Sequence, residues 1–408
     1  MQKPFILLLL LFLIIPSSIL SQKKTLEVVY RRSSLYTLMI KEPNRPYASV
    51  IQNTFINSAI PDKFNSHLLS ERKIENGLSR SIKKKEEKIR IQSQNINNYF
   101  SKKYIAKGMV SKWFNRSVNG TFNMRLVAER GSYNASDMDV ALAKSSKRGL
   151  ALLADAGEEL IKNTFILVND FDYISKEEVA NKTKAGLGLL KEIAELADVD
   201  IDTELADETL TTLGKGYVIR TTSYLYQLHW NDSVAAIFYN DYWMDEDSFN
   251  ENRKQAFENS NIFTLRLVGW EIAWADLQST SYTKKSEEEL IAVATVRAID
   301  AVIAKLQKKY EVFRTKTPLY SADPLSAKIG LKEGLEKGDK FEVLEQIMDK
   351  NGRTKYKSKG IIKVDKKQIW DNRFMAAEEQ DIIEEQAEYT LFKGGKNYYK
   401  GMLIRQIN

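Results

Sequence analysis

The sequence of 408 residues contains no cysteine and only two histidines. Without cysteine the protein cannot form disulfides, thiolate metal sites, a cysteine nucleophile or a lipid anchor on a cysteine. No G-x-S-x-G elbow accompanies His67 or His229, so we expect neither a hydrolytic triad nor a transition-metal centre. Stability must therefore come from burial, which a hydrophobic content of 43% can supply.

The chain also has little excess charge of either sign. Its 61 basic and 54 acidic residues give a formal charge of +7, and the two signs are interspersed. Even the basic cluster Lys83–Lys85 is followed at once by Glu86 and Glu87. This pattern indicates a solvated mixed surface, so no nucleic-acid partner is expected.

Long hydrophobic runs are missing too, apart from one at the start. An apolar run from Phe5 to Ile15 is preceded by a lysine and followed by a proline and Ser21. Such a run is too short to span the bilayer, which takes roughly 20 residues, and is typical of a secretory signal peptide. We therefore expect residues 1–21 to direct export to the periplasm or the outer-membrane periphery. We expect neither an integral membrane span nor a lipoprotein anchor.

The rest of the chain alternates runs with strand-like and helix-like spacing. The spacing predicts strands at residues 34–40, 108–114, 121–129, 164–171, 217–230, 233–243 and 263–276. It predicts helices at residues 70–103, 136–163, 175–197 and 286–310. We expect a proline-bearing loop after the first strand, a hairpin turn at Asn231-Asp232 and a bulge at Gly269.

Two of the predicted helices have recognisable apolar faces. The charged helix at 70–103 carries a thin stripe, made of Ile82, Ile89 and Ile96. The helix at 286–310 begins with Ser286 and Glu289 in capping-box spacing, and its wide apolar face must be buried against a sheet. That face consists of Ile291, Ala298, Ile299, Val302, Ile303 and Leu306.

From about residue 311 the pattern changes to short strands and glycine turns, which favours a small β-barrel. Strand-like runs lie at residues 341–346, 355–364, 368–374 and 398–407, with an acidic helix-like run at 376–389. The predicted fold is α+β or α/β, a mixed sheet packed by amphipathic helices and followed by a small carboxy-terminal β-barrel. The predicted divisions are a signal peptide at 1–21, an amino-terminal extension with the charged helix at 22–108, an α/β core at 109–310 and the barrel at 311–408.

The stretch IGLKEGLEKGDKFEVLE, residues 329–345, has regularly spaced glycines. A phosphate-binding loop needs a lysine followed by serine or threonine and then a helix start, whereas Gly338 is followed by Asp339 and a strand-like run. The interpretation that remains is a structural turn, made by Gly334, Gly338 and Asp339, that leads into a strand.

Residues 198–209 begin like a calcium loop, with acids at the first, third and fifth positions. Thr203 stands at the sixth position, where glycine makes the turn, and Thr209 at the twelfth, where a glutamate chelates. Neither this stretch nor the histidines complete a ligand set, so we expect no cofactor and no bound metal.

Aromatic side chains are dense between residues 224 and 243. Alternation along strands would place half of them in the core, and core packing explains that half. Tyr239, Tyr242 and Trp243 lie beside the acids of NDYWMDED and are the hardest to bury. We therefore interpret these three as candidate contacts for a protein partner or for a glycan.

The order of elements over residues 109–408 resembles that of bacterial envelope-assembly proteins. The similar families are the CsgG-like curli-secretion proteins and the FlgT-like flagellar proteins, whose α/β core is similar to the amino-terminal domain of TolB. The barrel of the flagellar relatives contains a G-x-x-x-G-L-x-x-G-D segment. The chain matches this segment with Gly334, Leu335, Gly338 and Asp339 in place.

The resemblance implies a non-enzymatic, exported envelope protein that acts as an assembly or scaffolding factor through protein–protein contacts. Its partners would be envelope proteins, associated with the outer membrane or peptidoglycan, and oligomers are compatible with the sequence. CsgG-like pores are lipoproteins, whereas this chain has no cysteine to acylate, so a pore is not expected. The alternative is a surface glycan-binding protein that uses the aromatic patch at Tyr239, Tyr242 and Trp243.

Overall fold

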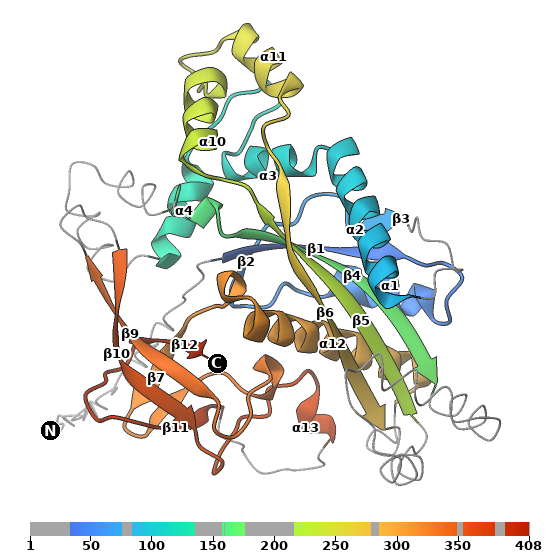
Figure 1. Ribbon diagram of the computed structural model, residues 1–408, viewed down its shortest axis with the longest axis vertical. Coiled ribbons are helices and arrows are strands. Elements are labelled where there is room, and N and C mark those ends of the chain that lie inside the picture. The colour runs from blue at the N-terminus through green and yellow to red at the C-terminus, as the bar shows by residue number, and fades with distance from the viewer. Residues whose placement is uncertain are drawn as a thin grey trace, which may run out of the picture.

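The computed structural model describes residues 33–75, 84–134, 157–158, 160–175, 216–278, 285–348, 354–379 and 388–407. A twisted sheet occupies the middle of the molecule, with a helical lobe at the top and a barrel at the lower left (Figure 1). The predicted signal peptide lies outside the described residues, as do most of the predicted helix at 136–163 and all of the predicted helix at 175–197 except Ser175, which ends a strand.

The central sheet has six strands in the order β2-β1-β4-β5-β6, with β3 also paired to β1. The strands are β1 (Ser33–Lys41), β2 (Phe64–Ser66), β3 (Lys73–Glu75), β4 (Thr164–Ser175), β5 (Gly216–Leu228) and β6 (Leu265–Gln278). β1 runs parallel to β2, β3 and β4, whereas β4, β5 and β6 are antiparallel to one another in sequence order. The sheet is therefore mixed, as predicted.

Strand β1 is buried along eight of its nine residues, because it lies inside the sheet and both of its faces are covered. Its near-continuous apolar sequence, SSLYTLMIK, is typical of a strand in this position. β1 comes from the segment predicted as an amino-terminal extension, yet it pairs with β4 of the predicted core. The sheet thus runs across that boundary, and the division into domains stays a prediction.

Helices cover both faces of the sheet. α1 (Ala48–Asn57) and α12 (Glu287–Lys309) pack on one face, and α2 (Lys85–Lys102) and α3 (Ile105–Trp113) pack on the other. The predicted capping box at Ser286 and Glu289 is confirmed, and all six residues predicted for the apolar face of α12 are buried. Ile89 and Ile96 of α2 are buried as predicted, while Ile82 lies outside the described residues.

Three predicted β-rich segments are helical, and these predictions were wrong. Residues 108–113 belong to α3, which ends before Phe114, and residues 125–129 of the segment 121–129 belong to α4 (Arg125–Asn134). The buried side chains of α3, including Ala106, Met109, Val110 and Trp113, have helical spacing, which the short apolar run concealed. The loop expected to carry the prolines also contains α1.

The third wrong segment is 233–243, which forms α10 (Asp232–Ile237) and the π-helical turn η1 (Phe238–Tyr242) instead of a strand. The side chain of Asn231 accepts a hydrogen bond from the Val234 amide at 2.9 Å. Asn231 is therefore an N-cap that starts a helix, and no hairpin turn forms there.

The carboxy-terminal part forms a closed barrel of six strands in the order β10-β11-β8-β7-β12-β9. Its strands are β7 (Thr317–Ala322), β8 (Leu325–Ala327), β9 (Lys340–Met348), β10 (Thr354–Val364), β11 (Thr390–Lys393) and β12 (Leu403–Ile407). The predicted strand at 368–374 is reduced to one bridge between Trp370 and Gly330. Of the predicted acidic helix, the structure describes α13 (Ala376–Glu379).

The predicted bulge at Gly269 is confirmed, since Leu225 pairs with Gly269 and Tyr226 pairs with Leu267. A Cβ atom at Gly269 would lie 2.1 Å from the hydroxyl oxygen of Tyr310, so glycine leaves the space that this ring occupies. The Tyr310 hydroxyl lies 3.3 Å from both the amide nitrogen and the carbonyl oxygen of Trp270. The end of α12 is thereby fixed to β6.

We expect Ser286→Ala to lower the free energy of unfolding by about 1 kcal/mol, because the α12 amide of Glu289 loses its capping acceptor. Chemical denaturation monitored by circular dichroism measures this loss. Ser286→Asp keeps a capping oxygen and should stay close to the unmodified protein. Equal losses in both variants would contradict a capping role.

Candidate partner-binding surface

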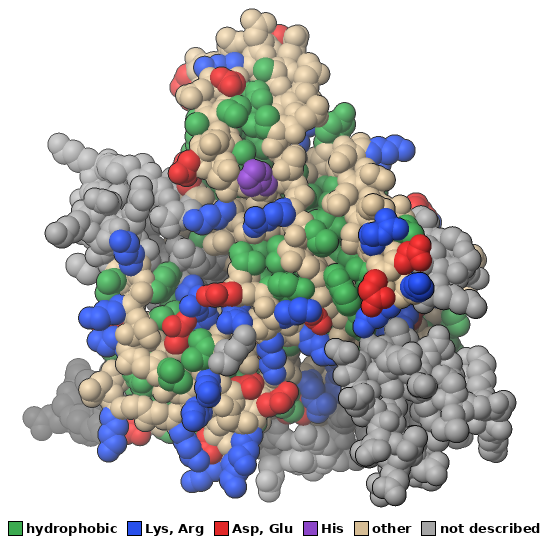
Figure 2. Space-filling model, viewed as in Figure 1, with side chains coloured by type: hydrophobic (Ala, Val, Ile, Leu, Met, Phe, Trp, Pro, Cys, Tyr) green, Lys and Arg blue, Asp and Glu red, His purple; other side chains and the backbone are tan. Residues whose placement is uncertain are grey.

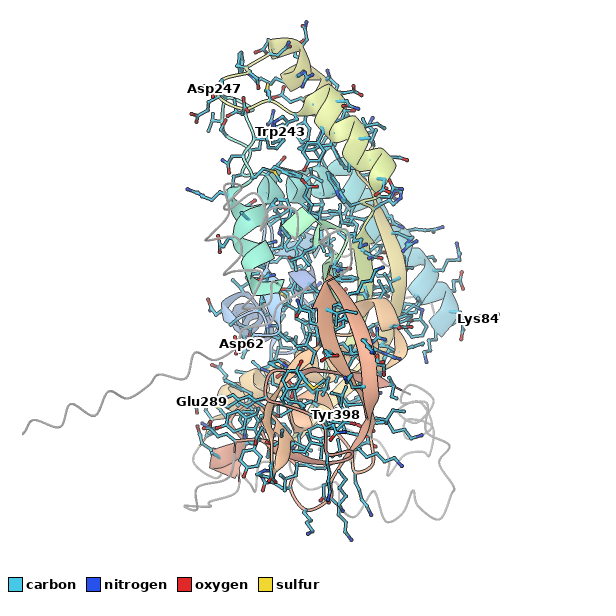
Figure 3. The ribbon with its side chains drawn as sticks, turned by 90° about the vertical axis from the view of Figure 1, so that its left-hand side faces the viewer. Asp62, Lys84, Trp243, Asp247, Glu289 and Tyr398 are labelled. Atoms are coloured by element: carbon cyan, nitrogen blue, oxygen red, sulfur yellow. The ribbon has the colours of Figure 1, made fainter. Side chains whose placement is uncertain are left out.

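The helical lobe at the top of Figure 1 is built around aromatic side chains. It is formed by α3, α4, α10, η1 and α11 (Glu251–Asn259). Trp243 and Asp247 lie near this end, whereas Tyr398 of the barrel lies toward the other (Figure 3). Its buried aromatic residues are Trp113, Phe114, Phe122, Trp230, Phe238, Tyr242, Phe257 and Phe263.

The three rings predicted as contacts all belong to this lobe. Tyr242 is buried, and Tyr239 and Trp243 are partly buried against the same cluster. The Tyr239 hydroxyl donates a hydrogen bond to Glu158 at 2.6 Å, and burial together with Glu158 raises the pKa of Tyr239. The Trp243 ring stacks on Phe122 with centroids 5.9 Å apart. These rings are therefore chiefly part of the packing of the lobe.

The loop that follows them, residues 244–250, presents a different set of side chains to solvent. Phe249 is 52% exposed, and Glu246 and Asp247 beside it are exposed as well. The acids could be identified from the sequence but Phe249 could not, because a single aromatic residue in a polar loop has no periodic pattern. We call Asp241, Glu246, Asp247 and Phe249 the apical surface.

Hydrogen bonds fix the shape of this loop. Asp245 accepts from the Ser248 amide at 3.0 Å, and the Ser248 hydroxyl accepts from the Asp245 amide at 3.0 Å. The Ser248 hydroxyl also donates to the Asp245 carboxylate at 2.5 Å, and this bond, together with that from the Ser248 amide, lowers the pKa of Asp245. Asn250 then caps α11 by accepting from the amides of Asn252 and Arg253 at 2.9 and 3.2 Å. Phe249 is thus held between two ordered turns.

The predicted turn residues lie at the opposite end, where the barrel meets α12. Gly334 and Gly338 have φ angles of +67° and +89°, in the left-handed region that favours glycine. The carboxylate of Asp339 accepts from the Glu336 amide at 3.0 Å and from the Gln406 side chain at 3.1 Å. Asp339 therefore joins the turn to β12, and the chain enters β9 directly after it.

The same turn packs on α12. A Cβ atom at Gly334 would lie 3.2 Å from the Cβ of Ala304, so the turn approaches the helix closely. Lys308 of α12 lies 3.4 Å from Glu336 and 3.7 Å from Asp339. The glycine turn therefore forms a contact between α12 of the core and the barrel.

Partly buried charged side chains lie beside the contact between the glycine turn and α12. Asp300 of α12 lies 4.0 Å from Lys332. Burial raises the pKa of Asp300 to about 6, although Lys332 and Lys63 oppose the shift. Burial also lowers the pKa of Lys63, whose ammonium donates to Gln307 at 2.9 Å. This group of charged side chains could not be recognised in the sequence, because its members come from three distant segments.

An ion-pair network lies near the carboxyl ends of β1 and β4. Arg45 lies 2.7 Å from Asp170 and 3.0 Å from Asp172, and Arg220 of β5 also pairs with Asp172. Burial raises the pKa of Asp170 against the attraction of Arg45. Burial opposes ionisation of Asp172 as well, but Arg220 and Arg45 outweigh it and lower that pKa. The network links the loop after β1 to β4 and β5.

The two histidines have structural surroundings. His67 is fully buried, with Nδ1 2.8 Å from the Arg130 guanidinium and Nε2 3.0 Å from the Met109 carbonyl. Burial and Arg130 lower the pKa of His67, so the neutral ring accepts from Arg130 and donates to Met109. His229 is exposed and lies 3.2 Å from the Asn231 side chain. Within the described residues, no three acids or histidines are grouped to hold a metal ion.

Comparison with known proteins gives no assignment: no protein-family model matches the chain, and no curated protein matches its sequence significantly. The resemblance to CsgG-like and FlgT-like proteins therefore stays a prediction. In the described part of the chain, no helix has both the length and the apolar composition needed to cross a membrane.

We expect Gly338→Val to lower the stability of the barrel by roughly 1–2 kcal/mol, because a β-branched residue is strained at a φ of +89°. Native-state hydrogen exchange should show faster exchange in β9 and β10, with β4 and β5 unchanged. Gly338→Asn, which tolerates this region better, should have a smaller effect. Unchanged exchange in the valine variant would contradict the turn assignment.

We expect stability to depend on pH through Asp300. Because burial raises its pKa above the unfolded value of 3.8, the folded protein keeps this proton to higher pH, and stability falls as the pH rises toward about 6. Between about pH 7 and about pH 5 the unmodified protein should gain roughly 1 kcal/mol relative to Asp300→Asn. Denaturation at both pH values measures this difference, and parallel pH profiles would refute it.

Proposed function

We propose that this protein is an exported, non-enzymatic envelope protein that acts as an assembly or scaffolding factor through protein–protein contacts. The observation that carries the proposal is the apical surface, where an ordered loop holds Phe249 exposed among acidic residues. Large aromatic side chains are frequent anchors of protein interfaces, and a loop already held in shape loses little entropy on binding.

The charge of the apical surface indicates the kind of partner. Asp241, Glu246 and Asp247 are exposed, and the last two lie in the same loop as the anchor Phe249. Acidic rims of this kind contribute more to the rate and specificity of association than to affinity. We therefore expect a partner that offers an apolar pocket for Phe249 bordered by lysine or arginine.

The arrangement of the molecule supports a scaffolding role. The lobe that carries the apical surface lies at the top of Figure 1 and the barrel at the lower left, and α12 contacts both the sheet and the turn before β9. Two partners could therefore bind the two ends without meeting. The predicted signal peptide supports export to the periplasm or the outer-membrane periphery.

The glycan-binding alternative fits the described structure less well. Sugars stack on open ring faces. Tyr242 is buried, and the Trp243 ring is stacked on Phe122 within the lobe. A protein contact at Phe249 needs no rearrangement of that packing.

We expect Phe249→Ser to reduce partner binding at least tenfold, because it removes the exposed anchor and leaves the buried cluster intact. Purified protein carrying a photo-crosslinking residue at position 247 would identify the partner in envelope extracts. Titration with that purified partner then gives the affinity of each variant.

Tyr399→Ser provides a matched control, since Tyr399 of the barrel is 54% exposed and Phe249 is 52% exposed. It should bind the partner as the unmodified protein does. Equal binding by the Phe249 variant would overturn the apical contact. Failure to crosslink any envelope protein, with a freely diffusing monomer, would overturn the proposed function.

A further inference from the structure

Three lysines lie at one level on three neighbouring strands of the barrel. Lys363 of β10 is directly opposite Lys340 of β9 on one side and Lys393 of β11 on the other. All three are exposed. Because these positions are 23 and 30 residues apart in the chain, only the strand register brings them together.

The three side chains point away from the barrel interior. Successive residues of a strand point to opposite faces, and the neighbours Phe341, Ile362 and Phe392 are buried in the barrel core. The rings of Phe341 and Phe392 meet with centroids 5.4 Å apart. An inner apolar row therefore lies beneath an outer lysine row.

This row is electrostatically unfavourable for the isolated protein. Like charges directly opposite one another on neighbouring strands are destabilising, and the strands are only about 4.8 Å apart. Within the described residues, Lys393 pairs with Asp365 at 3.0 Å, whereas Lys340 and Lys363 have no acidic partner. Lysines often protect the open edge of a sheet, but a closed barrel has no such edge.

Further lysines extend the positive surface around the same end of the barrel. Lys366 and Lys367 are exposed just after β10. Lys337 is exposed in the glycine turn, which reaches β10 through a 3.1 Å hydrogen bond from Gly338 to the Val364 carbonyl. Lys and Arg side chains are frequent over the barrel, at the lower left of Figure 2. We call the three paired lysines the lysine row and all six the basic surface.

We propose that the basic surface binds the anionic headgroups of a lipid bilayer and holds the protein at the membrane surface. Clusters of four to eight basic residues are typical of such binding, and each lysine near an anionic bilayer strengthens it about fivefold. Lysine is a point charge without the fork of arginine, which suits a diffuse anionic surface better than one fixed carboxylate or phosphate. The proposal does not depend on the partner of the apical surface.

An exposed apolar side chain beside the row favours lipid over a soluble polyanion. Ile361 is 53% exposed and lies two residues before Lys363, so both point outward from the same strand. An isoleucine among lysines adds contact with the acyl boundary of a bilayer, whereas a hydrated acidic polymer gains nothing from it.

Co-sedimentation of the purified full chain with vesicles tests the proposal. Vesicles of equal parts phosphatidylcholine and phosphatidylglycerol should bind the protein, pure phosphatidylcholine should not, and added salt should weaken binding. The triple variant Lys340→Gln, Lys363→Gln, Lys393→Gln should lose about a hundredfold in partition coefficient. Its thermal midpoint should not fall, because mutual repulsion is removed.

A second triple variant, Lys84→Gln, Arg90→Gln, Lys102→Gln, removes the same charge from exposed positions at the N-cap of α2 and along the helix. It should bind vesicles within about threefold of the unmodified protein. Equal losses in both triple variants would show that only net charge matters and would overturn the basic surface. Absence of vesicle binding, or binding to polyphosphate without binding to vesicles, would overturn the lipid proposal.

Discussion

The burial of α12 against β5 and β6 is the contact on which the rest of the structure depends, because the same helix also carries the barrel. One side of the helix places residues such as Ile291, Val302 and Leu306 in the main core, each contributing about 1.5–3 kcal/mol through burial. Other positions, Ala304 and Lys308, meet the glycine turn. Loosening α12 would therefore disturb the sheet and the barrel together.

The parts of the fold that could be predicted from the sequence are those with a long, clear period. β4, β5, β6 and α12 all have runs of more than ten residues, and the capping box at Ser286 and the bulge at Gly269 were visible as local chemistry. The errors fell on short segments rich in Val, Phe, Tyr and Trp, whose strand propensity hid helical spacing in α3 and around Asn231. Tertiary packing determines the helical conformation of these segments, which propensity alone does not predict.

The candidate sites were predictable to a smaller extent, for a related reason. The acids of the apical loop and the glycine turn are contiguous in the chain, so the sequence could point to them. The Arg45–Asp170 pair spans 125 residues, and the lysine row requires the register of three strands. No local pattern encodes such pairings. The exposure of Phe249 could be recognised only once the structure showed which aromatic residues are buried in the lobe.

The contact between Tyr310 and β6 has a consequence for assembly. β6 is the last strand of the central sheet, and outward-facing backbone groups of such a strand can recruit a strand from another chain. The Tyr310 hydroxyl bridges the amide and carbonyl of Trp270, and Lys305 donates to the Ile272 carbonyl at 3.0 Å. These two side chains therefore occupy backbone groups of β6 to which an added strand would have to bind. A strand of another chain could therefore pair with this stretch of β6 only by displacing Tyr310 and Lys305.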